Sequence, residues 1–292
     1  MVESRLIEGV ARIDLRVREI GRALSFYRDV IGLEAIEETP ERASLRSAGG
    51  PLLLTLTSTG VSEPADPSAT GLFHVAIRFP TRAALGDVLA RAIERGYRVG
   101  AGDHLVSEAL YVDDPDGNGV ELYWDRPREQ WPAPAADAAV PMPSLPVDLR
   151  SVMDEGRGAA AVGDMAPGGT DVGHVHLQVS DIEATTRFYV ETLGLDLMMS
   201  LPGSAAFFSS NGYHHHIGAN TWRSRAGRPS QRNRAGLDCV MLSAGAEEID
   251  KLRSRVMSSG RSEIDQEPGS LSVHDPDDIT LQFVEEAGPL PR

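Results

Sequence analysis

The chain has 292 residues, of which 41% are apolar and 24% are charged, and its formal net charge at pH 7 is −15. These fractions exclude a wholly disordered chain, and the negative charge would repel the phosphates of a nucleic acid. Because Cys239 is the only cysteine and no run reaches roughly 18 apolar residues, the sequence predicts neither an intrachain disulfide nor a transmembrane helix.

The first predicted elements are a strand that begins near Arg12 and an amphipathic helix that ends at Gly32. Alternation of polar and apolar residues indicates the strand, and glycine fits the positive φ that commonly ends a helix. Short strands and a turn at residues 48–50 follow, which completes a first module near residues 11–57. The order of elements in this module is therefore βαβββ.

A second module with the same order spans residues 72–124. Residues 73–79 form its predicted first strand and residues 82–95 its helix, and further strands run to Trp124. The following stretch, residues 126–170, is rich in proline, alanine and glycine, which favours a long linker. We expect one short helix within this linker, at residues 149–154.

The third module repeats the first so closely that residues 12–33 and 174–195 align without a gap. The Phe-Tyr pair of each helix and the glycine at its end coincide, and an Asn-Gly turn at Asn211 predicts a hairpin. A fourth module again has a strand, a helix and further strands, so the repeat predicts one unit repeated four times. The last two modules lie near residues 173–221 and 236–284.

These repeated strands and Phe-Tyr-x4-Gly-Leu helices resemble the vicinal oxygen chelate superfamily of glyoxalases, bleomycin resistance proteins and dioxygenases. The resemblance implies an α+β fold in which four βαβββ modules form two curled, eight-stranded cups around a metal. We expect modules 1 and 2 in residues 1–125, a linker in 126–170, and modules 3 and 4 in 171–292. The fold leaves the function open, because these three classes of protein share it.

One motif narrows the function, and it lies in the second module between His104 and Glu121. It resembles the signature of the extradiol ring-cleavage dioxygenases, in particular the two-domain catechol 2,3-dioxygenases. The resemblance implies that Glu121 binds a metal, whereas His104 and Tyr111 contact the substrate. Each residue alone could be an ordinary strand or loop residue, and residues 114–119 alone could be a simple turn or part of a calcium loop.

The resemblance also implies one histidine ligand on the first strand of each module that contributes to the metal site. His74 and His174 occupy that place in modules 2 and 3, whereas modules 1 and 4 have Arg12 and Asp238. An arginine cannot ligate a metal, because it has only donors. We therefore predict that modules 2 and 3 pair across the linker and bring His74, Glu121 and His174 together. Modules 1 and 4 would form a second cup in which Arg12 meets Asp238.

Three consecutive histidines follow the Asn-Gly turn of the third module, and we predict that they lie in a strand. Alternation would then send His214 and His216 to one face and His215 to the other. In the dioxygenases that the chain resembles, a histidine of this strand serves as an acid–base group near O₂. The sequence leaves the choice between His214 and His215 open, and His176 would only support the neighbouring ligand His174.

Two imidazoles and one carboxylate are typical of non-haem Fe(II) sites. We therefore predict an extradiol dioxygenase that cleaves a small aromatic diol with O₂ at Fe(II), with Mn, Zn or Ni as less favoured metals. The alternatives are a glyoxalase-like isomerase or lyase and a non-enzymatic ligand-binding protein of the bleomycin resistance type. Residues 1–17 lack the apolar core of a signal peptide, so we expect a cytoplasmic protein, and a homo-oligomer is compatible with the sequence.

Overall fold

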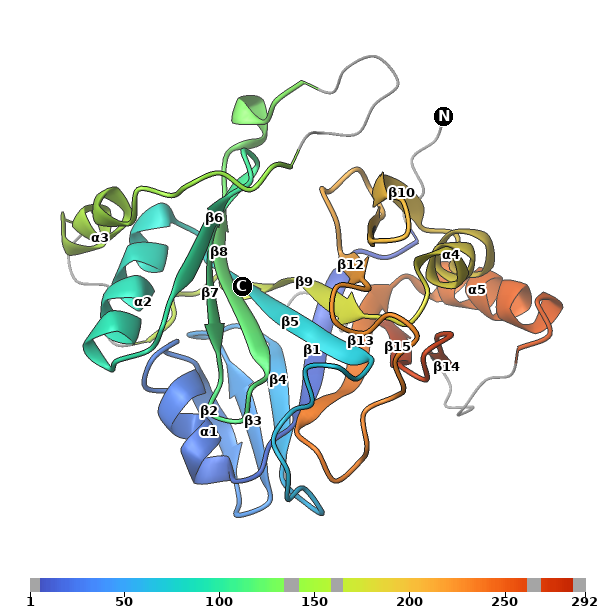
Figure 1. The fold of residues 1–292 in the computed structure, drawn as a ribbon, viewed down its shortest axis with the longest axis horizontal. Helices are drawn as coiled ribbons and strands as arrows, with labels where there is room; N and C mark the ends of the chain where they lie inside the picture. Colours follow the sequence, from blue (N-terminus) through green and yellow to red (C-terminus); the bar gives the residue numbers. More distant parts are fainter. Residues whose placement is uncertain (1–5, 134–141, 159–164, 262–268, 286–292) are drawn as a thin grey trace.

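Each of the four modules begins with a long strand, and these four strands, β1, β5, β9 and β13, lie at the centres of two curled sheets. The computed structural model describes residues 6–133, 142–158, 165–261 and 269–285. Figure 1 shows helices α1 to α3 on one side of the molecule, α4 and α5 on the other, and the sheets between them. The predicted α+β class and the four repeated modules are confirmed.

The elements follow the predicted order in every module, and their bounds divide into the two sequence halves. Modules 1 and 2 consist of β1 (Gly9–Arg16), α1 (Ile20–Tyr27), β2 (Glu34–Glu38), β3 (Arg42–Arg46) and β4 (Leu52–Thr57), then β5 (Gly71–Arg78), α2 (Arg82–Glu94), β6 (Gly100–Asp103), β7 (Ser107–Asp113) and β8 (Gly119–Asp125). Modules 3 and 4 consist of β9 (Asp171–Gln178), α4 (Ile182–Thr186), the π-helical turn η2 (Arg187–Leu193), β10 (Asp196–Leu201), β11 (Ala205–Ser209) and β12 (Ile217–Asn220), then β13 (Gly236–Ala244), α5 (Ala246–Ser258), β14 (Ser270–His274) and β15 (Thr280–Glu285).

Between the halves, the linker contains a short 3₁₀ turn, η1 (Arg128–Gln130), and helix α3 (Leu149–Gly158), which packs on α2. This helix confirms the short helix predicted in the linker. None of the helices in the described part of the chain has the length and apolarity that a membrane crossing requires.

The modules pair across the linker, as predicted. One sheet has eight strands in the order β10-β11-β12-β9-β5-β8-β7-β6, so it combines modules 2 and 3. The other has the order β14-β15-β13-β1-β4-β3-β2 and combines modules 1 and 4. We call them the eight-stranded cup and the seven-stranded cup. The expected eighth strand of the latter would fall between α5 and β14, where residues 262–268 lie outside the described residues.

The tyrosine of each Phe-Tyr pair connects the two modules of one sequence half, although these modules belong to different cups. The Tyr27 hydroxyl donates to Asp114 at 3.1 Å, and the Tyr189 hydroxyl donates to Asp275 at 3.2 Å. Burial raises the pKa of Asp114 to about 6 and that of Asp275 to about 7. Each repeated tyrosine therefore closes a buried turn of the next module, which explains why it recurs at the same place.

The register of the seven-stranded cup corrects one predicted correspondence. Val240 pairs with Ile13 just as Val75 pairs with Val175 in the other cup. The residue before each valine is therefore equivalent, so Cys239 takes the place of His74. The prediction that Asp238 occupies this place was wrong by one residue.

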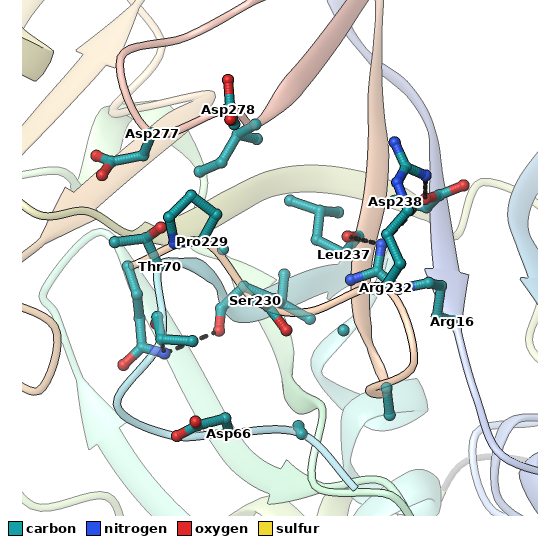
Figure 2. A pocket seen from close by; sticks show the side chains of 18 of the residues that line it. Arg16, Asp66, Thr70, Pro229, Ser230, Arg232, Leu237, Asp238, Asp277 and Asp278 are labelled. Atoms are coloured by element: carbon teal, nitrogen blue, oxygen red, sulfur yellow. Dashed lines mark hydrogen bonds and ion pairs between the residues drawn. The ribbon is translucent and has the colours of Figure 1, made fainter. Parts of the chain in front are cut away.

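The predicted contact between Arg12 and Asp238 is also wrong. Arg12 lies opposite Met241 and pairs with Asp14, its neighbour on the same face of β1, at 2.7 Å. Asp238 instead accepts from Arg16 at 3.0 Å. Figure 2 shows Arg16 and Asp238 together on the wall of a polar cavity of about 250 Å³ that residues of both cups line.

Candidate metal centre

Three side chains converge in the eight-stranded cup from its three adjacent central strands. His74 comes from β5, Glu121 from β8 and His174 from β9, and one ligand atom of each lies within 4.8 Å of the other two. Glu121 and His174 both pair in register with Ala76, so they flank one small residue of the strand between them. The pairing of modules 2 and 3 thus produces the predicted juxtaposition of His74, Glu121 and His174.

The protonation states of His174 and Glu121 suit a divalent metal. Burial lowers the pKa of His174 to about 4, so its imidazole is neutral at pH 7. Burial alone would raise the pKa of Glu121, but His174 and His74 outweigh it and hold this pKa well below its ordinary value. A metal requires neutral imidazoles and an ionised carboxylate as ligands.

The geometry also suits a metal ion held between the side chains better than direct hydrogen bonds between them. The Nε2 atom of His74 lies 3.0 Å from Glu121 Oε2, and the Nε2 atom of His174 lies 3.5 Å from the same oxygen. Nevertheless, the buried Nε2 of His74 has no hydrogen-bond partner among the described residues. Buried polar atoms are normally paired, so a nitrogen left without a partner beside a carboxylate is consistent with a bound cation. The residues present therefore fit a metal with two nitrogen ligands and one oxygen ligand.

His104 and Tyr111 form a hydrogen-bonded pair on the wall of the same cavity. Tyr111 lies opposite Glu121 on the neighbouring strand β7, and its hydroxyl is 2.7 Å from His104 Nε2. His104 Nδ1 lies 2.8 Å from the carbonyl oxygen of Pro143, which only accepts, so Nδ1 donates and a neutral ring accepts at Nε2. Burial, followed by the charge of Glu121, raises the pKa of Tyr111 and keeps its hydroxyl protonated.

The three consecutive histidines lie just before β12 and not inside it, so the alternation predicted for them is wrong. His214 and His215 both line the cavity, whereas His216 lines a separate cavity and its Nδ1 lies 3.0 Å from Ser209 Oγ. Outside a regular strand, nothing forces successive side chains to opposite faces. The His215 ring packs on His174, with 4.1 Å between ring centroids.

One cavity of about 490 Å³ is lined by the three candidate ligands, the His104–Tyr111 pair, His214 and His215, and His176 lines it as well. The rest of its wall is largely apolar and includes Trp222, which is 53% exposed. No sequence pattern indicated this apolar wall, because its residues come from β5, the loop between β6 and β7, the linker, β10, β11 and the segment after β12. Its apolar members are Phe73, Val106, Met142, Met199, Leu201, Phe207 and Trp222.

The family of the chain follows from this fold and these residues. Residues 9–122 and 171–283 match the model of the Glyoxalase/Bleomycin resistance protein/Dioxygenase superfamily, so the chain belongs to that superfamily. It is 41% identical over 266 residues to the Catechol-2,3-dioxygenase of Bacillus subtilis (strain 168), which covers 90% of this chain and 92% of the relative. The chain is thus an enzyme similar to the extradiol dioxygenases.

Two solved structures show the same fold. A putative dioxygenase from Bacillus subtilis subsp. subtilis str. 168 has a TM-score of 0.66 at 13% identity, over 96% of this chain and 86% of the other. Glyoxalase I from Zea mays has a TM-score of 0.56 at 18% identity, over 95% and 92% respectively. At such low identity these likenesses concern the fold alone.

Proposed function

We propose that the chain is an extradiol ring-cleavage dioxygenase that acts on a catechol-like diol with O₂ at a mononuclear Fe(II) centre. In this proposal His74, Glu121 and His174 hold the metal. The observation that carries it is the convergence of these three groups in one cavity with the His104–Tyr111 pair and with His215. The 41% identity to a Catechol-2,3-dioxygenase supports the same reaction.

Different side chains of the cavity would bind the metal, accept a proton from the substrate and donate a hydrogen bond to it. Bound Fe(II) would supply a redox-active Lewis acid with coordination positions left open for the diol. One carboxylate and two neutral imidazoles leave a net positive centre, which favours an ionised catechol oxygen. His215 Nε2 is buried without a partner among the described residues, so it can accept a proton from a diol hydroxyl. When His104 carries a hydrogen on both ring nitrogens, its Nε2 donates to the Tyr111 hydroxyl, whose own hydrogen is then free to be donated to a substrate oxygen.

The cavity also indicates the kind of ring that it would accept. Among the described residues that line the cavity there is neither lysine nor arginine, and apolar side chains such as Phe73 and Phe207 pack beside the histidines. An acidic substituent on the ring would find no cationic partner there, and burying an unpaired charge is costly. We therefore propose a catechol whose substituents are uncharged.

The two alternative functions have less support. A glyoxalase-like isomerase would use the same fold, but it has no need for a general base placed to ionise a diol. A ligand-binding protein without a metal would leave the converging nitrogens and the buried carboxylate unexplained.

Reconstitution under anaerobic conditions tests the proposal most directly. We expect the Fe(II)-loaded protein to consume one O₂ per catechol and to form a yellow ring-opened product, and the Zn²⁺-loaded protein to do neither. A catechol with a carboxylate substituent should be turned over more slowly than an unsubstituted one. Stable iron loading without O₂ uptake on any catechol of the panel would refute the proposed reaction.

A second experiment concerns the His104–Tyr111 pair. We expect His104→Ala and Tyr111→Phe to retain iron and to lower kcat by about 10²–10⁴-fold, the usual contribution of a general acid–base group. Matched controls are His274→Ala and Tyr97→Phe, because neither residue lines this cavity. Full kcat in both cavity variants would mean that the pair is only structural.

A further inference from the structure

Asp125 lies at the end of β8, outside the lining of the cavity, yet its carboxylate connects to the cavity through His214. The carboxylate receives three contacts: His214 Nε2 lies 3.1 Å from Oδ1, while the Tyr213 hydroxyl and Arg78 Nη1 donate to Oδ2 at 2.8 and 3.2 Å. Burial opposes ionisation, but the contacts of His214, Tyr213 and Arg78 outweigh it and lower the pKa of Asp125. Asp125 is therefore an anion that only accepts hydrogen bonds.

With both rings neutral, this anion determines where the two neighbouring histidines carry their hydrogens. His214 Nε2 must bear a hydrogen in order to donate to Asp125, and a neutral imidazole has only one. His214 Nδ1 then presents a lone pair to His215 Nδ1, which lies 2.8 Å away. The hydrogen between these two atoms consequently belongs to His215, and His215 Nε2 is left with a lone pair.

The lone pair on His215 Nε2 is buried, and it belongs to a ring that lines the candidate catalytic cavity. His215 Nε2 is buried and has no hydrogen-bond partner among the described residues, while the His215 ring lines the candidate catalytic cavity. In the opposite tautomer Nε2 would carry a hydrogen and could not accept the proton of a diol.

We propose that Asp125 is a positioning residue that acts through His214 to fix the tautomer of His215, so that a basic nitrogen faces the substrate. This inference rests on the proposed function only for the identity of the proton donor, a hydroxyl of the diol. In the step itself, the O–H bond of the diol breaks and an N–H bond forms at His215 Nε2. Asp125 touches neither substrate nor metal.

The substitution Asp125→Asn should move the hydrogen of His214 and that of His215 to the other nitrogen of each ring. Arg78 can only donate, so it holds the amide oxygen at the position of Oδ2 and directs the amide nitrogen towards His214 Nε2. The amide would then donate to Nε2 and drive the His214 hydrogen to Nδ1, which would in turn donate to His215 Nδ1. His215 would be forced to carry its own hydrogen on Nε2. An aspartate-to-asparagine change in Ser-His-Asp triads similarly leaves the geometry intact and lowers kcat about 10⁴-fold through the wrong tautomer.

Nitrogen-15 NMR of the full chain with labelled histidine tests the tautomer without any assay. Spectra would be taken at a pH of about 8, above the ordinary imidazole pKa of about 6.5, without metal and again with diamagnetic Zn²⁺. The His215 signals are assigned as those missing from the His215→Asn spectrum. We expect hydrogen on Nδ1 and a bare Nε2 in the unmodified chain, and the reverse in Asp125→Asn.

Kinetics on the iron-loaded protein provide the second readout. Asp125→Asn should lower kcat by about 10²–10⁴-fold with unchanged metal content, the range expected when a general base is lost. Asp171→Asn is the matched control, because Asp171 also pairs with Arg78, at 2.6 Å, but makes no contact with His214. This control should leave both the His215 tautomer and kcat nearly unchanged.

The outcomes separate this inference from the proposed function. Hydrogen on His215 Nε2 in the unmodified chain would overturn the inference even if Asp125→Asn failed to fold. An unchanged tautomer or an unchanged kcat in a folded Asp125→Asn protein would overturn it as well. Neither result would affect the proposed ring cleavage, which fails instead if the iron-loaded chain consumes no O₂ with any catechol.

Discussion

Replacement of Glu121 by glutamine is expected to abolish both metal binding and turnover. Glu121 is the only anion among the three converging groups, and at 4% exposure no water can substitute for it easily. Changes in groups that merely hydrogen-bond to a metal ligand already cost about 10–100-fold in affinity, so loss of the anionic ligand should cost at least that much. The measurement is the iron content after equilibrium dialysis against a series of Fe(II) concentrations, together with kcat.

A suitable control neutralises another buried carboxylate of the same sheet. Glu108 is 6% exposed and pairs with Arg82 instead of a histidine, so Glu108→Gln should leave the iron affinity unchanged. Iron binding by Glu121→Gln with the affinity of the unmodified chain would show that the three groups are not the ligand set, whatever the activity.

The metal stoichiometry follows from the difference between the two cups. In the seven-stranded cup, the strand register places Arg12, Cys239 and Gln282 where the other cup has His174, His74 and Glu121. A guanidinium has no lone pair to offer, and burial, followed by the charges of Asp14 and Asp238, raises the pKa of Cys239 to about 12. The described residues of this cup therefore provide no ionised ligand set at these places, and one iron per chain is expected.

The fold and the crossed pairing could be predicted from the sequence because the repeat and its defects are local. The gapless match of residues 12–33 with 174–195 identified equivalent positions, and arginine at position 12 made pairing within one half chemically unsuitable. The resemblance to the extradiol dioxygenases supplied Glu121 and the ligand place on the first strand, which His74 and His174 occupy. The choice of modules 2 and 3 then depended on which side chains at that place can bind a metal.

The register of β13 could not be predicted in this way. The predicted correspondence placed Asp238 at the position of His74. In the structure, the equivalent positions of the two strands are found by matching their first residues, Gly71 of β5 and Gly236 of β13. Both glycines have a positive φ, 135° and 152° respectively. A shift of one residue sends every side chain to the opposite face, so this small error produced the wrong partner for Arg12.

The contacts of Asp125 were also beyond the reach of the sequence. Asp125 belongs to module 2, whereas Tyr213 and His214 belong to a loop of module 3, and their contact depends on how β8 and β9 flank β5. Likewise, no motif indicated that Pro143 of the linker would bind His104. Such contacts arise from the packing of segments that are distant in the chain, for which a single sequence contains no pattern.

Replacement of His215 by asparagine is expected to lower kcat by about 10²–10⁴-fold while iron remains bound, because this residue would act as a general base without ligating the metal. The adjacent His216→Asn is an exacting control. His216 is also buried, at 4% against 7% for His215, but it lines a different cavity and contacts Ser209. The two variants therefore each remove one imidazole ring, from adjacent positions. They differ in which cavity the removed ring lines.

The comparison is made with kcat, KM and iron content measured on both variants in parallel. Loss of turnover confined to His215→Asn would support the orientation of the histidines in the structure. Equal loss in both variants would indicate that the segment matters only for packing. Loss confined to His216→Asn would contradict the orientation of the two side chains in the structure. The histidine that matters for the reaction would then be the one that contacts Ser209, and not the one that packs on His174 of the candidate metal centre.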